Sequence, residues 1–149
     1  MAITRANVEA FLVKRCGSLL TAAGMDGTTV SGSNADLNDP IGYAIRKCGG
    51  TVAALASVAD SDLAGIDSAD YDQLIDIAEL RTLESIEGNL DDVDISVGSR
   101  RESLNQLAAQ VAKKIDRKRE QVERAYGVNV GVLEAGVVSL GFQEQNTSE

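Results

Sequence analysis

Three acidic side chains share one face of a predicted helix. Asp72, Asp76 and Glu79 stand at positions i, i+4 and i+7, a spacing that places side chains on the same side of an α-helix. Carboxylate oxygens suit a divalent cation, but such sites usually recruit further ligands from a second helix or a loop. A solvated acidic face is far more common, so we expect neither a metal ion nor a cofactor here.

Two other segments resemble ligand-binding motifs but lack residues that those motifs need. The stretch 60–65 imitates the start of a calcium loop, yet Ala64 stands at its fifth place and Tyr71 at its twelfth, where a bidentate glutamate is required. The glycine-rich stretch 24–32 lacks the Lys-Ser/Thr ending of a P-loop, and no strand is predicted before it. The chain contains no histidine, the commonest metal ligand and the usual general base. We therefore expect a protein that is not an enzyme.

Composition limits the partners and the compartment. A domain of 149 residues buries roughly 68–70% of the surface of its unfolded chain, enough for a substantial core. The net charge of −9 argues against nucleic acid as the main partner, because phosphate binding depends on Lys and Arg. Cys16 and Cys48 fall on apolar stripes of predicted helices, which favours buried free thiols in a reducing compartment. No apolar run approaches the ~20 residues of a membrane span, so we expect a cytosolic origin and no membrane contact.

The first half of the chain predicts two helices. Thr4 is a suitable N-cap, and apolar residues then recur at steps of three and four until Gly24. Residues 25–38 are rich in Gly, Thr, Ser, Asp and Asn, which predicts a long loop. Asp39-Pro40 begins a second helix whose apolar spacing runs to Ala59. We predict one continuous helix, with a weak point at Gly49-Gly50, where each glycine costs about 1 kcal/mol relative to alanine.

The second half predicts two longer helices. Residues 69–88 are apolar over more than one face, which is typical of a helix at the centre of a bundle or against a neighbouring subunit. Val93, Ile95 and Val97 alternate and predict a short extended segment at 91–98. Ser99 to Glu102 matches a capping box, and a helix of about 26 residues, near 40 Å long, follows as far as Tyr126.

The end of the chain changes pattern. Apolar residues alternate in two short runs, the second being Val138, Leu140 and Phe142. These runs predict a hairpin or a pair of extended arms, which need another surface because an isolated ribbon is marginal in water. The predicted fold is mainly α: a four-helix bundle over residues 1–127 with one long C-terminal helix, followed at 128–149 by a short extended or β-hairpin tail with a disordered end.

Charge is divided unevenly between the two long helices. Residues 60–94 hold twelve acids and one base, whereas residues 100–124 hold eight bases and four acids. In one interpretation the two segments form an antiparallel pair within one chain. In the other they meet between copies, and head-to-tail contacts of this kind close into rings. The second interpretation assigns inter-subunit contacts to Asp72, Asp76, Glu79, Lys114, Arg117 and Lys118.

One part of the chain resembles a family. The run 74–84 (LIDIAELRTLE), then 88–90 (GNL), 93–98 (VDISVG) and the basic helix to Tyr126-Gly127 are similar in pattern to the head-to-tail adaptor proteins of tailed bacteriophages, also called connector or head completion proteins. The resemblance covers about residues 68–127 and rests on no catalytic motif.

The resemblance implies a structural role in the virion. It implies a helical protomer, commonly in twelve copies, that forms a ring between the portal protein and a tail-side neck or terminator protein. DNA passes through such a ring as cargo. A C-terminal arm containing Val138, Leu140 and Phe142 would reach the portal by strand addition. Carboxylates facing the channel, for which we expect Asp91, Asp92 and Asp94, would repel phosphate and let DNA slide.

An alternative function needs no virion. A non-enzymatic, chaperone-like protein could hold a partner helix on the broad apolar face of residues 69–88. It differs from the adaptor in leaving that face free within the monomer.

Overall fold

A computed structural model describes residues 2–97 and 101–127, with side chains for 2–90 and 105–127. The chain is mainly helical, as predicted, and contains no strand within those ranges. Its elements in order are α1 (Arg5–Ala22), the 3-10 turn η1 (Ala35–Leu37), α2 (Asn38–Lys47), α3 (Asp60–Leu63), the 3-10 turn η2 (Ser68–Asp70), α4 (Tyr71–Val97) and α5 (Arg101–Tyr126). None of the described helices is long and apolar enough to cross a membrane.

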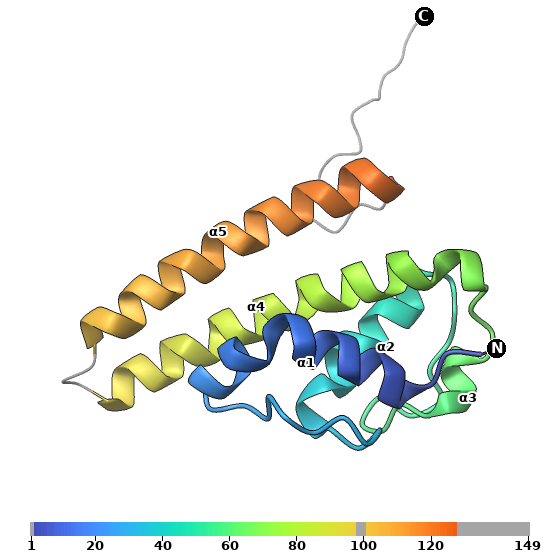
Figure 1. Cartoon of the computed structure of the whole chain (residues 1–149), viewed down its shortest axis with the longest axis horizontal. Helices are drawn as coiled ribbons and strands as arrows, with labels where there is room; N and C mark the ends of the chain where they lie inside the picture. Colours follow the sequence, from blue (N-terminus) through green and yellow to red (C-terminus); the bar gives the residue numbers. More distant parts are fainter. Residues whose placement is uncertain (1, 98–100, 128–149) are drawn as a thin grey trace, which may run out of the picture.

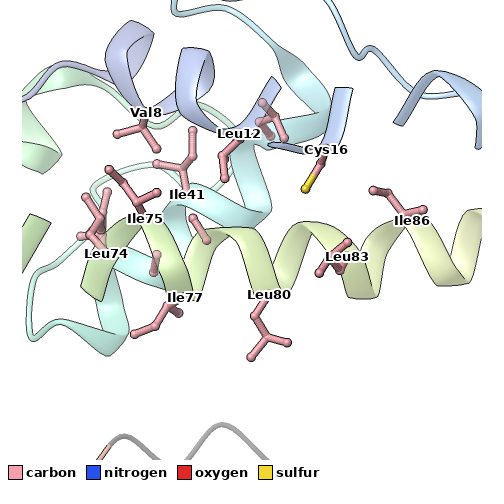
Figure 2. Packing of buried hydrophobic residues seen from close by; sticks show 14 of the residues in the cluster. Val8, Leu12, Cys16, Ile41, Leu74, Ile75, Ile77, Leu80, Leu83 and Ile86 are labelled. Atoms are coloured by element: carbon pink, nitrogen blue, oxygen red, sulfur yellow. The ribbon is translucent and has the colours of Figure 1, made fainter. Parts of the chain in front are cut away.

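Helix α4 is the centre of the molecule. Helices α1 and α2 pack against one side of it, and α5 runs antiparallel along another side (Figure 1). Figure 2 shows Leu74 and Ile75 facing α1 and α2, whereas Ile77 and Leu80 project from the opposite side of α4. All four are buried. Of the two explanations for a segment apolar on more than one face, a central position or a neighbouring subunit, the structure shows the central position.

Helix α1 begins and ends where the sequence predicts. The Thr4 hydroxyl accepts the Asn7 amide at 3.2 Å, and the Asn7 side chain accepts the Thr4 amide at 3.1 Å, which forms a capping box. At the other end Gly24 has φ 78°, and the Met25 amide donates to the Leu20 carbonyl at 2.8 Å. These bonds form a Schellman cap, which satisfies carbonyls left free by the last turn.

The predicted continuous second helix is wrong. Helix α2 ends at Lys47, because Gly49 has φ 89° and the Gly50 amide donates to the Ile45 carbonyl at 2.9 Å. This is the same Schellman cap that ends α1, so Gly49-Gly50 terminates the helix instead of weakening it. Residues 48–59 form an irregular connection, and only then does the short α3 begin.

The predicted extended segment at 91–98 is also wrong over residues 91–97, the part that the structure describes. Helix α4 is 27 residues long and continues to Val97, straight through Gly88. Once a helix is nucleated, each added residue gains a hydrogen bond without a new nucleation cost, and this outweighs a short alternation of β-branched residues. Ser99, which is predicted to cap the next helix, and the tail with Val138, Leu140 and Phe142 lie outside the described residues.

A buried ion pair holds two loops against α1. Arg5 and Glu9 are 4% and 0% exposed, and their side chains meet at 2.8 Å between Nε and Oε2. Arg5 also donates to the carbonyls of Val58 at 2.8 Å and Asn34 at 2.6 Å. Glu9 accepts the amides of Gly32 at 2.7 Å and Asn34 at 3.0 Å. One turn of α1 thus fixes the loop before η1 and the loop before α3.

The loop that follows α1 crosses that helix at close range. A Cβ on Gly27 would lie 2.1 Å from the Gly17 carbonyl oxygen, a distance that no side chain tolerates. Glycine is therefore required at Gly27 for the backbones to approach this closely. The predicted long loop at 25–38 is packed on the helix, and its end folds into η1 and the start of α2.

Candidate interaction site

A cluster of charged side chains joins α1, α4 and α5. Asp76 on α4 accepts hydrogen bonds from Arg15 at 3.1 Å, Lys118 at 2.9 Å and the Tyr126 hydroxyl at 2.6 Å. Glu79, one turn further along α4, lies 2.7 Å from Arg15 and 3.1 Å from Lys118. Three helices therefore meet at two carboxylates.

Partial burial strengthens this cluster. The side chains of Asp76, Glu79 and Lys118 are 13%, 17% and 11% exposed, so water screens their attraction less than on an open surface. Burial acts to raise the pKa of Asp76, but hydrogen bonds from Tyr126, Lys118 and Arg15 outweigh it and hold that pKa below its usual range. Asp76 is therefore ionised at neutral pH and acts as the acceptor at the centre of the cluster.

The Tyr126 hydroxyl gives this contact a spectroscopic signature. Its hydrogen bond to Asp76, together with burial, raises the pKa of Tyr126 to about 12. A raised folded-state pKa stabilises the fold fully below the unfolded value of about 10, and this contribution is lost as the pH rises toward 12. We expect Asp76→Asn to return the Tyr126 pKa toward 10. Ultraviolet titration of tyrosinate checks this; Tyr126→Phe identifies the late-titrating group, and an unchanged late titration in Asp76→Asn would contradict the contact.

Further charged contacts join α4 to α5 and to α2. Arg119 on α5 lies 2.9 Å from Glu84 on α4. Arg81 on α4 donates to Asp39 on α2 at 2.9 Å and lies over the Tyr43 ring at 4.6 Å. Exposed pairs of this kind contribute little individually to stability.

A hollow of ≈ 180 Å³ opens beside the cluster. Lys114 and Arg117 on α5 line it and are exposed, and neither forms an ion pair within the part of the chain that the structure describes. The other lining residues are Arg15, Cys16, Glu79, Leu83, Lys118 and Gln121. Since Arg15 and Lys118 are offset by Asp76 and Glu79, the uncompensated charge of the hollow is the two cations of Lys114 and Arg117.

Burial favours the protonated form of the thiol in this hollow. Burial, with a smaller effect of Glu79, raises the pKa of Cys16 to about 12, so the thiol stays protonated at neutral pH. Cys16 is 1% exposed and belongs to the hydrophobic core. The second cysteine, Cys48, has a pKa raised to about 11, again mainly by burial.

The predicted charge contacts divide into two groups. Asp76, Glu79 and Lys118 pair within one chain, as the first interpretation of the charge pattern expects. Asp72, Lys114 and Arg117 are exposed and form no such pair among the described residues, so contacts with another copy stay a prediction for them. Residues 2–90 and 105–127 contain no group of three or more acidic or cysteine side chains that could hold a metal ion.

The acids predicted to face a channel are only partly located. The backbone of Asp91, Asp92 and Asp94 belongs to α4, but their side chains lie outside the described residues. Sequence reasoning missed Arg15 and Tyr126 as members of the cluster. Arg15 lies in the interior of α1 and Tyr126 is the last residue of α5, and neither position carries a sequence signal for this contact.

Comparison with known proteins gives no relative. No protein-family model matches the chain, and no curated protein or solved structure is similar to it.

Proposed function

We propose that this protein is a structural assembly subunit: a head-to-tail adaptor that forms a ring between the portal and the tail at a phage neck. In this proposal the protomer is a four-helix bundle of α1, α2, α4 and α5 followed by an extended or β-hairpin arm. The ring extends the channel for DNA, and the virion neck is the place where the protein works.

The observation that supports assembly is the location of the charges that the fold leaves unpaired. Five acids between Asp60 and Asp72 lie on α3, directly before and on η2, and on the first turn of α4, and none forms an ion pair among the described residues. The unpaired cations Lys114 and Arg117 lie midway along α5. A subunit with one acidic and one basic patch at different places is suited to head-to-tail contacts.

The alternative of a helix-holding protein has lost its main support. It requires a free apolar face on the segment 69–88, but that face is covered by α1, α2 and α5, and Leu74, Ile77, Leu80 and Ile86 are at most 1% exposed. A partner helix would have to displace one of these elements first.

The adaptor proposal is tested with the portal protein of the same phage. Mixing the two and imaging the particles should show portal rings with an extra layer of density. A variant ending at Gly136 should keep the helical circular dichroism of the full chain and lose docking, because the arm with Val138, Leu140 and Phe142 is missing. Portal rings without an added layer would contradict the adaptor function, and unchanged docking of the shortened variant would remove the arm from the mechanism.

A further inference from the structure

Each unpaired charge patch has a large apolar side chain beside it. Phe11 is 45% exposed and lies one helical turn before Arg15, which lines the basic hollow. Leu55 is 69% exposed, in a loop that Asp62 holds through the amides of Ala53 at 3.2 Å and Ala59 at 2.8 Å. Among the described residues, the other exposed large hydrophobic side chain is Val30.

The two patches cannot meet within one chain. The acidic patch lies beside the start of α1, since the Asp60 carboxylate accepts the Arg5 amide at 2.7 Å. Arg15 at the hollow is ten residues further along α1, or about 15 Å at 1.5 Å per residue. On α4, Asp72 is about 10 Å from Glu79, the nearer of the lining residues on that helix. Both patches are fixed to the same rigid helices, so only another molecule can bring them together.

We propose that the acidic patch of one copy docks on the basic hollow of a second copy. The acidic patch is the segment 60–72 with Leu55, and the basic hollow is defined by Lys114 and Arg117, with Phe11 one helical turn from its lining residue Arg15. Carboxylates pair with the two cations while Leu55 and Phe11 lose exposed apolar surface. This inference rests on the proposed function, because it supplies the subunit contact of the ring.

The contact is heterologous and weak in isolation. A docked pair still presents one free hollow and one free acidic patch, so growth continues until a ring closes. The net charge of −9 makes two copies repel each other at long range, which opposes association of free chains. A portal ring that holds several copies side by side raises their effective concentration and so favours closure.

A carboxylate patch fits the hollow better than a nucleic acid does. Two uncompensated cations are too few to hold a polyphosphate against a protein of this net charge. A single inorganic phosphate could still occupy the same place, so it forms a separate arm of the test.

Carbodiimide cross-linking measures the contact directly. The full chain is prepared in unlabelled and ¹⁵N-labelled form, mixed at up to about 1 mM, and treated with the carbodiimide, which joins an amine to a carboxylate in direct contact. We expect links of mixed isotope between Lys114 and the segment 60–72. Arg117→Ala, which keeps the Lys114 amine, and Leu55→Ser should each lower the yield of that link about tenfold, whereas the matched control Arg124→Ala should not.

Each outcome decides the proposal. No mixed-isotope link at the highest concentration, links confined to one chain, or equal yields in Arg117→Ala and Arg124→Ala would overturn it. So would amide shifts at Lys114 and Arg117 on addition of inorganic phosphate without any such link, since the hollow would then be a site for a free anion. If portal rings gain an added layer while the cross-link is absent, the adaptor function stands and this contact is wrong. If the cross-link forms while portal rings gain no layer, the contact stands and the adaptor function is wrong.

Discussion

Replacing Glu9 by glutamine is expected to lower the free energy of unfolding by about 3–5 kcal/mol. The carboxylate accepts three hydrogen bonds, from Arg5 at 2.8 Å, the Gly32 amide at 2.7 Å and the Asn34 amide at 3.0 Å. Glutamine offers one oxygen and turns an NH₂ group toward one of these donors. It also leaves Arg5, which is 4% exposed, as a buried charge without a counter-ion.

Denaturant unfolding followed by circular dichroism measures this loss, and the melting temperature should fall by on the order of 10 °C. The chain contains a matched control in Glu120→Gln, because Arg124 and Glu120 form the same kind of i, i+4 pair at 3.2 Å with side chains 76% and 70% exposed. The control should change the free energy by less than about 0.5 kcal/mol. Equal effects of the two substitutions would mean that burial does not determine the strength of the Arg5–Glu9 pair.

The double variant Arg5→Met with Glu9→Met separates two explanations. The stability lost in Glu9→Gln comes either mainly from the unpaired charge of Arg5 or mainly from the unpaired amides. In the first case, the double variant should lose less unfolding free energy than Arg5→Met and Glu9→Met lose together as single variants. The amides of Gly32 and Asn34 then remain without their acceptor, so we expect an unfolding cost that is reduced but not abolished.

The sequence predicts the helices but not what fixes the loops between them. Thr4 and Gly24 carry local capping chemistry, so the limits of α1 follow from its own residues. The role of Arg5 depends on the carbonyls of Asn34 and Val58, which are 29 and 53 residues away and have no side-chain signature. A contact of this kind depends on tertiary structure, and the spacing of apolar residues in the sequence does not predict it.

The two errors in helix limits have a common cause. At Gly49-Gly50 the apolar spacing continues, but the backbone adopts the left-handed cap, so local geometry prevails over the pattern. At 91–97 the apolar alternation suggests a strand, but an established helix propagates through it. In both places the side-chain pattern alone does not show whether the preceding helix ends or continues.

The sequence predicts only part of the candidate site. Charge imbalance between the two long helices leaves pairing within one chain and pairing between copies open, and Lys118 pairs with Asp76 and Glu79 within one chain. The contribution of Arg15 requires α1 to lie beside α4, which charge counting cannot show. The segregated charges that remain, at 60–72 and at Lys114 and Arg117, become visible only after the internal pairs have been assigned.

Leu80→Ala is expected to lower the free energy of unfolding by about 2–5 kcal/mol, because it removes a fully buried side chain and leaves a cavity. Leu80 is 1% exposed and projects from the side of α4 opposite to α1 (Figure 2). Its neighbour Glu79 contacts Lys118 on α5, one turn from the buried Ile115. The lost packing therefore lies in the interface between α4 and α5. Leu55→Ala, at a site 69% exposed, is the matched control and should stay within about 0.5 kcal/mol.

Hydrogen exchange locates the effect of this substitution. Helix α5 packs mainly against α4, whereas α4 also packs against α1 and α2, so α5 should open at lower free energy than the rest in Leu80→Ala. Amides of α5 should then exchange faster by a larger factor than those of α1. An equal acceleration in both helices would show that α5 unfolds only with the whole domain. The distinction bears on assembly, because Lys114 and Arg117 present the basic hollow only while α5 is docked on α4.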